Sequence, residues 1–258
     1  MLEFDRLTQI MARLRAPDGC PCDKEQTHQT LRPYLIEESA ETLEAIEEND
    51  ARHLCEGLGD LLLQVVFHAQ IAAEAGEFSI EDVARGINEK LVRRHPHIFG
   101  DARADDAATV KANWDAIKNQ EKAERGEIQT SILGQTNDEL PALAAALKIS
   151  KRAAKVGFEW PDEAGVVAKL REELAEVEDA LAREGNERVA EELGDLLFTI
   201  VNLARWRGIH PELALRDNNR KFRARFEKME AEARRRGWDL ETLDEAEWDA
   251  LWNAAKAS

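Results

Sequence analysis

Two groups of acidic residues lie on consecutive predicted helices in the second half of the chain, at spacings that gather carboxylates on one side of a helix. They are Glu172, Glu173 and Glu176, followed by Glu192 and Asp195. At 100° per residue, the first three share one flank, and the last two lie along one line of the next helix. Like charges at such spacings cost roughly a few tenths of a kcal/mol per pair unless a cation lies among them. These five residues are therefore our candidates for cation-dependent catalysis.

The helix that carries Glu192 and Asp195 is apolar over most of its circumference, which predicts burial in a helical bundle. Its apolar residues are Leu193, Leu196, Leu197, Phe198, Ile200, Val201 and Leu203, and its polar line continues through Thr199 and Asn202. On the preceding helix we expect the buried stripe to be Leu170, Leu174, Val177 and Leu181. Carboxylates that point into such a bundle need neutralisation, and a divalent metal is the simplest source of it.

The ligand chemistry favours Mg²⁺, with Mn²⁺ as the second candidate. Helical bundles build such sites from acids on facing helices, and oxygen ligands without His or Cys suit these ions better than zinc. A metal-free interpretation stays open, because Lys169 stands four residues before Glu173 and Arg188 four residues before Glu192. Such pairs would form a polar network or a solvated, salt-bridged helix face.

The chain contains an internal repeat. Glu37-Glu38-Ser39-Ala40-Glu41 recurs as Glu172-Glu173-Leu174-Ala175-Glu176, and Leu58-Gly59-Asp60-Leu61-Leu62 recurs at the same offset as Leu193-Gly194-Asp195-Leu196-Leu197. A constant offset over two separated segments indicates two copies of one module. We expect modules at 1–126 and 141–258, joined by a linker at 127–140 that is rich in turn and cap residues.

Composition supports an all-α fold. Aromatic residues make up 6% of the chain, and Ala, Leu, Glu and Arg recur throughout, which favours helices over sheets. In the second module, Gly and Pro residues between the helical segments predict helices at 142–154, 163–184, 187–207, 211–236 and 243–256.

The charge balance excludes some classes of partner. A net charge of −17 repels nucleic acid and anionic lipid surfaces, so we expect neither as a partner. No apolar run approaches the roughly 20 residues of a membrane span, and the start of the chain has no export segment. We therefore expect a cytoplasmic protein.

The acidic pattern resembles that of the MazG family of nucleoside triphosphate pyrophosphohydrolases, in the all-α NTP pyrophosphatase group. The resemblance covers essentially the whole chain, including the tandem two-domain form. The other segments that carry it are Asp23-Lys24-Glu25-Gln26-Thr27, Arg94-His95-Pro96-His97, Gly157-Phe158-Glu159-Trp160 and Lys221-Phe222.

The resemblance implies Mg²⁺-dependent hydrolysis of a nucleoside triphosphate to a monophosphate and pyrophosphate, by a metal-activated water that attacks the α-phosphorus. It implies four metal ligands, with Glu172 as a further ligand or as the base that orients the water. The ligands would be Glu173, Glu176, Glu192 and Asp195; the phosphate contacts would be Lys169, Arg188, Lys221 and Arg225; and Trp252 would lie against the nucleotide. It also implies a homodimer, in which a second chain completes the helical bundle.

The two copies differ at the acidic site. Gly57 stands where the second copy has Glu192, so the first line reads Gly57, Asp60, Gln64 and Phe67. Adjacent Glu56 points 100° away and cannot replace the lost acid. We expect little or no hydrolase activity from the first module, which would serve dimer packing, regulation or weak metal binding.

Other functions fit the same residues. The acids do not choose a base, so a narrower pyrophosphatase for dUTP, dCTP or phosphoribosyl-ATP is one alternative. A nucleotide-binding regulator or sensor with negligible turnover is a second, and a salt-bridged helical scaffold is a third. A P-loop ATPase is disfavoured, because the sequence lacks a Gly-x-x-x-x-Gly-Lys-Ser/Thr loop.

Overall fold

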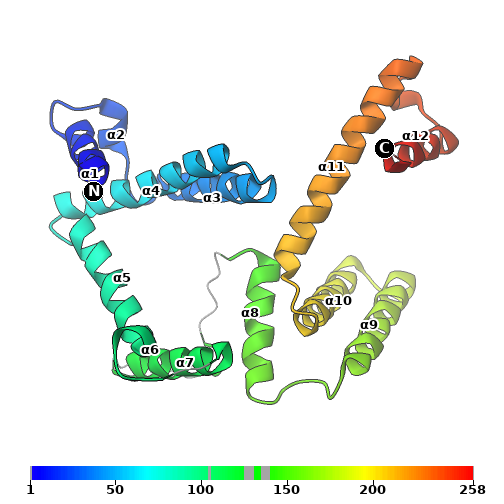
Figure 1. Cartoon of the computed structure of the whole chain (residues 1–258). Coiled ribbons are helices and arrows are strands. Elements are labelled where there is room, and N and C mark those ends of the chain that lie inside the picture. Colours follow the sequence, from blue (N-terminus) through cyan, green and yellow to red (C-terminus); the bar gives the residue numbers. More distant parts are fainter. Residues whose placement is uncertain (1, 104–105, 125–130, 135–139, 258) are drawn as a thin grey trace. The chain divides into compact units, whose positions relative to one another are not determined.

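The structure, a computed structural model, describes residues 2–103, 106–124, 131–134 and 140–257, and these residues contain helices but no β-strand (Figure 1). The all-α prediction is therefore confirmed. Contacts divide the chain into two compact units, Met1–Glu127 and Ile128–Ser258. Most of the predicted linker at 127–140 lies outside the described residues.

The first unit is built around a pair of long helices. Its helices are α1 (Leu2–Arg15), α2 (Pro21–Glu25), α3 (Arg32–Glu47), α4 (Ala51–Glu74), α5 (Ile80–Arg94), α6 (Pro96–Phe99) and α7 (Ala107–Glu124). Helix α3 packs along α4, and α1 covers another part of α4 (Figure 1). Asp50 ends the turn between α3 and α4 by accepting hydrogen bonds from the backbone N–H groups of Arg52 and His53, which caps α4.

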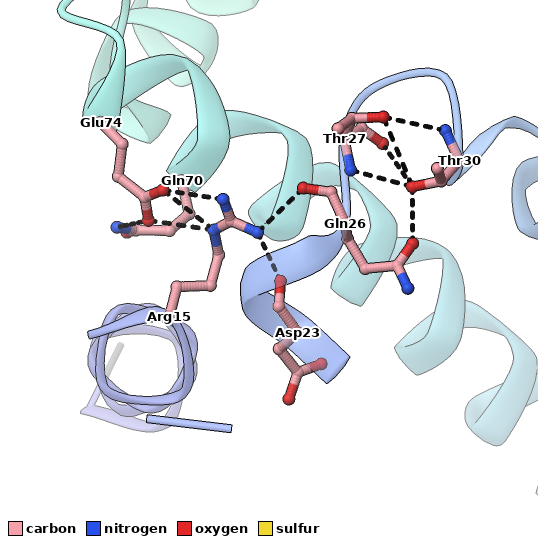
Figure 2. A network of polar contacts seen from close by, with 7 residues as sticks. All are labelled: Arg15, Asp23, Gln26, Thr27, Thr30, Gln70 and Glu74. Atoms are coloured by element: carbon pink, nitrogen blue, oxygen red, sulfur yellow. Dashed lines mark hydrogen bonds and ion pairs between the residues drawn. The ribbon is translucent and has the colours of Figure 1, made fainter. Parts of the chain in front are cut away.

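A single arginine fastens three helices of the first unit together (Figure 2). Arg15 on α1 forms an ion pair with Glu74 on α4 at 2.8 Å. It also donates hydrogen bonds to the carbonyl oxygens of Asp23 at 2.5 Å and Gln26 at 3.2 Å, at the end of α2. Hydrogen bonds from Arg15 hold the pKa of Glu74 below its usual value. Residues 23–27, one of the segments that carry the family resemblance, thus connect the end of α2 to α1.

The second unit repeats the central helix pair. Its helices are α8 (Ala142–Lys155), α9 (Glu163–Arg183), α10 (Asn186–Trp206), α11 (Pro211–Arg236), the short 3₁₀ helix η1 (Leu240–Thr242) and α12 (Glu245–Ala257). All five predicted α-helices are present, with bounds within two residues of those predicted. Helix α9 packs along α10, α8 covers α10, and α11 pairs with α12. Asp162 caps α9 through a 2.8 Å bond from the Gly165 N–H, and left-handed Gly237 ends α11.

A buried polar network holds α8 against α10. Ser150 on α8 donates to the side-chain oxygen of Asn202 on α10 at 2.6 Å and accepts from Arg205 at 2.6 Å. Arg205 also forms an ion pair with Glu159, which accepts a further bond from the Trp206 indole at 2.9 Å. Although burial raises the pKa of Glu159, the bonds from Trp206 and Arg205 outweigh that effect and hold it below its usual value. At Asn202, the polar line of α10 therefore has a structural role, because this side chain helps to hold α8 against α10.

The predicted burial of the apolar side of α10 is confirmed for Val201 but is wrong within this chain for most of that side. Leu193, Leu197, Phe198 and Ile200 are exposed, whereas the polar residues Glu192, Thr199 and Asn202 are buried. On α9, Val177 is buried as predicted, but Leu174 and Leu181 are exposed, and Glu173 is buried in their place. The periodicity identified the apolar side of each helix correctly. The intramolecular contacts of α9 and α10 cover Glu173 and Glu192 together with Val177 and Val201, and leave the larger apolar side chains exposed.

None of the described helices is both long enough and apolar enough to cross a bilayer. The cytoplasmic location stays a prediction.

The Arg15–Glu74 pair predicts an acid-sensitive contribution to stability. Replacing Glu74 by Gln should lower the free energy of unfolding at neutral pH by about 1 kcal/mol, a modest value because Glu74 is partly exposed. The folded-state pKa of Glu74 is lowered, so this contribution is fully present above the ordinary value of 4.5 and is lost as the pH falls through the folded-state value. Urea unfolding at neutral and acid pH measures the difference.

Glu77→Gln, which removes an exposed acid from the turn after α4, is the matched control and should change stability at neither pH. A Glu74→Gln deficit that persists unchanged at acid pH would contradict the assignment.

Candidate functional site

Three glutamates from α9 and α10 converge in the second unit. Glu173 and Glu176 on α9 and Glu192 on α10 each offer one carboxylate oxygen, and these three oxygens all lie within 4.8 Å of one another. Glu173 is 5% exposed and Glu192 is 3% exposed, whereas Glu176 lies at the exposed side of the group. We call Glu173, Glu176 and Glu192 the acidic group. It is built by the antiparallel pairing of two helices, each of which supplies a buried carboxylate.

Two cations border the acidic group. The Lys169 ammonium lies 3.0 Å from a Glu173 oxygen and 2.7 Å from a Glu172 oxygen. On α10, Arg188 forms an ion pair with Glu192 and a second one with Glu191 at 2.7 Å. Both i,i+4 pairs expected from the sequence are therefore formed.

The acidic group and the two cations beside it shift one another's pKa values. A hydrogen bond with Glu173, and to a lesser extent burial, raises the pKa of Glu176 above its usual value. Hydrogen bonds to Glu172 and Glu173 raise the pKa of Lys169, and contacts with Glu191 and Glu192 raise that of Arg188. Both shifts show that the surrounding potential is negative.

The acidic group fits a hard divalent cation. Its donors are three carboxylate oxygens, two of them on buried side chains, and they come from facing helices as in other bundle metal sites. Such a donor set suits Mg²⁺ or Mn²⁺ better than a metal that prefers nitrogen or sulfur.

Two of the predicted acidic site residues lie outside the acidic group. Asp195 is exposed on α10. Glu172 is also exposed and pairs with Lys169. The sequence correctly indicated which helices carry the acids. It could not indicate that the contact between α9 and α10 runs through Glu173 and Glu192 and leaves Asp195 outside.

The remaining candidates gather on α11 and α12. The Arg225 guanidinium lies 5.5 Å from the centre of the Trp252 ring, and Phe222 packs against the same ring at 5.9 Å. The Lys256 ammonium lies 5.3 Å from the centre of that ring. Lys256 was not among our candidates, although its position one turn after Trp252 in the sequence could have indicated it. Lys221 is exposed on α11. The contacts shown for Arg225 and Trp252 lie within the α11–α12 hairpin. The predicted site residues therefore form two groups, one on α9 and α10 and the other on α11 and α12.

In the first unit, α3 and α4 pack closely at the position that matches Glu192. At Gly57, a Cβ atom would lie 2.9 Å from the Thr42 hydroxyl oxygen and 3.3 Å from the Thr42 Cα. Helices α3 and α4 therefore pack so closely at this position that a larger residue would force Thr42 to shift. Burial, and then repulsion from Asp60, raises the pKa of Glu38, the counterpart of Glu173. Among the residues that the structure describes, no group of three metal-ligating side chains forms in this unit.

The first unit does keep a counterpart of the Trp252 arrangement. Arg94 lies 4.6 Å and Lys118 lies 5.3 Å from the Trp114 ring centre. Here, however, Arg94 and Arg93 both pair with buried Glu121, at 2.5 Å and 2.6 Å. Hydrogen bonds from Arg94 and Arg93 lower the pKa of Glu121 to about 2.

Comparison with known proteins gives a consistent result. The MazG nucleotide pyrophosphohydrolase domain matches the chain twice, at residues 26–99 and 162–229. The nucleoside triphosphate pyrophosphohydrolase/pyrophosphatase MazG of Thermotoga maritima is 48% identical over 98% of this chain and 95% of its own length. The nucleoside triphosphate pyrophosphohydrolase of Escherichia coli K12 is 45% identical over 99% of this chain and 98% of its own length. An uncharacterized Bacillus subtilis protein, YabN, is 47% identical over 98% of this chain but only 52% of its own length.

The close packing at Gly57 predicts opposite effects for two glycines on one helix. Gly57→Ala should destabilise the chain by about 1–3 kcal/mol, because the new methyl group meets Thr42 on α3. Gly59→Ala should stabilise it by about 0.5–1 kcal/mol, because no atom lies within 4 Å of the added Cβ and alanine favours the helix. Urea unfolding of both variants measures the contrast.

Adding Thr42→Ala to Gly57→Ala should recover part of the loss, since the hydroxyl oxygen is the nearest clashing atom. Equal effects of the two glycine substitutions would refute the packing argument.

Proposed function

The chain belongs to the MazG nucleotide pyrophosphohydrolase family, and we propose that its second module hydrolyses nucleoside triphosphates to the monophosphate and pyrophosphate. The observation that carries this proposal is the acidic group between α9 and α10. Buried carboxylates cost stability even when Lys169 and Arg188 pair with them, and a role in binding a cationic ligand would account for that cost.

In the proposed mechanism, Glu173, Glu176 and Glu192 hold Mg²⁺, or Mn²⁺ in its place. When bound, such an ion supplies charge neutralisation for phosphate oxygens and lowers the pKa of a water. Glu172, exposed beside Glu173, would orient the water that attacks the α-phosphorus. Asp195 as a fourth ligand stays a prediction, because its exposed side chain lies outside the acidic group.

The cations would contact the substrate. Lys169 and Arg188 border the acidic group and are suited to phosphate oxygens. We assign Lys221, Arg225 and Trp252 to the nucleotide as well. The stacking of Arg225 over Trp252 supports this assignment, since a flat ring beside a cation suits a base and its phosphates.

Product identity tests the reaction. We would incubate the full chain with mixed NTPs and dNTPs, with Mg²⁺ or EDTA, and measure pyrophosphate and orthophosphate separately. Glu192→Gln should lower Mg²⁺-dependent pyrophosphate release at least about 100-fold, because a metal site contributes several kcal/mol to the barrier. Asp60→Asn, a matched change in the first module, should leave the rate unchanged.

Other outcomes identify the alternatives. Orthophosphate release would refute attack at the α-phosphorus. Mg²⁺-dependent nucleotide binding without turnover would indicate a sensor, and turnover of dUTP or dCTP alone would indicate a narrower pyrophosphatase.

We also propose that a second copy of the chain covers the exposed apolar sides of α9 and α10. Leu174, Leu181, Leu193, Leu197 and Ile200 are each 44% to 66% exposed. So many large apolar side chains on one helix pair are typical of an interface. A dimer built there would complete the bundle around the helix pair that carries the acidic group.

Sedimentation velocity tests the dimer. Leu197→Glu should shift the chain toward the monomer, because a charge would be buried in the interface. Leu2→Glu, a change at an exposed leucine on α1, serves as the control. A sedimentation coefficient that is the same for both variants and the unchanged chain would contradict this interface.

A further inference from the structure

The two buried carboxylates of the acidic group each have one cationic partner that is more exposed than they are. The Lys169 side chain is 32% exposed and that of Glu173 is 6% exposed, whereas Arg188 is 51% exposed and Glu192 is 5% exposed. The cations therefore reach inward from the surface. Each one neutralises a carboxylate that would otherwise be buried and unpaired.

Lys169 also has one exposed partner, and Arg188 has two. Lys169 lies 2.7 Å from Glu172, whose side chain is 59% exposed. Arg188 lies 2.7 Å from Glu191 and 3.7 Å from Glu184, both on the exposed side of α10 and the turn before it. Lysine and arginine side chains are long enough to move between such partners while the backbone stays in place.

A divalent cation and these two side chains compete for the same oxygens. An ammonium held about 3 Å from a carboxylate oxygen would stand close to any metal ion bound there, and like charges at a few ångströms repel strongly in a partly buried site. The acidic group can therefore be neutralised from within the chain or by a metal, but not fully by both.

We propose that Lys169 and Arg188 are exchangeable counter-ions, which neutralise Glu173 and Glu192 when no metal is bound and transfer to Glu172, Glu191 and Glu184 when it is. This inference rests on the proposed metal site in the second module. The exposed glutamates are the partners of the released cations until a triphosphate binds. The cations then move to its phosphate oxygens, which frees Glu172 for the attacking water. Metal and triphosphate binding should consequently favour each other, and this coupling must be reciprocal.

The proposal predicts that removing a counter-ion strengthens metal binding. In the full chain without nucleotide, at mildly alkaline pH so that the glutamates are ionised, Mn²⁺ binding is followed by electron paramagnetic resonance. Lys169→Met and Arg188→Met should each tighten the site about fivefold, because the competing ion pair is gone. Each should also lower the melting temperature without metal and increase the rise in that temperature on adding Mn²⁺.

Arg183→Met is the matched control. It removes a positive charge from the exposed Arg183–Asp179 pair on the same helix α9, and should change Mn²⁺ affinity much less. Only the Mn²⁺ binding that disappears in Glu192→Gln is counted. This restriction distinguishes Mn²⁺ bound in the second module from Mn²⁺ bound weakly elsewhere in the chain.

A measurement on the unchanged protein covers the case in which a variant fails to fold. The Arg188 Nη2 protons, which face Glu192, should shift in the NMR spectrum after Mg²⁺ is added, whereas the Nη1 protons of Arg183, which face Asp179, should not. Unchanged or weaker Mn²⁺ binding in both variants, with a site that still depends on Glu192, would overturn the exchange and leave the proposed function intact. Absence of any Glu192-dependent Mn²⁺ site in the unchanged chain would overturn both.

Discussion

The burial of Glu173 and Glu192 between α9 and α10 is the constraint on which the second module depends. Two carboxylates buried in one helix–helix contact need positive charge beside them. Without it, the desolvation of both lowers the stability of the fold. Lys169 and Arg188 supply it from the same two helices. The two buried carboxylates are thus neutralised within the chain itself.

Both modules hold a flanking helix against the acid-bearing helix pair with a buried arginine, but they use different geometry. In the first, Arg15 extends from α1 to Glu74 on α4 and to the end of α2. In the second, Arg205 extends from α10 to Ser150 on α8 and to Glu159 in the following turn. In each case the arginine also bonds groups that do not ionise, namely the Asp23 and Gln26 carbonyls or the Ser150 hydroxyl. The acidic partners Glu74 and Glu159 therefore make the attachment of the flanking helix sensitive to pH.

Most of the fold could be predicted from the sequence, because helix ends depend on local chemistry. Asp162 and Gly237 mark their helix termini by capping geometry that any bundle would keep. The side of α10 that this chain covers could not be predicted, because periodicity separates a polar from an apolar side without saying which neighbour lies against either. For the same reason, the sequence identified Glu173, Glu176 and Glu192 but could not separate them from Asp195, which differs only in its angle on the helix.

The contact between Gly57 and Thr42 has a consequence for any attempt to engineer a second acidic site into the first module. A glutamate introduced at position 57 would bring its Cβ to 2.9 Å from the Thr42 hydroxyl oxygen and 3.3 Å from the Thr42 Cα before its carboxylate could reach a ligand position. Supplying the missing acid therefore requires a second change on α3 that widens the helix pair, so the two positions have to be redesigned together.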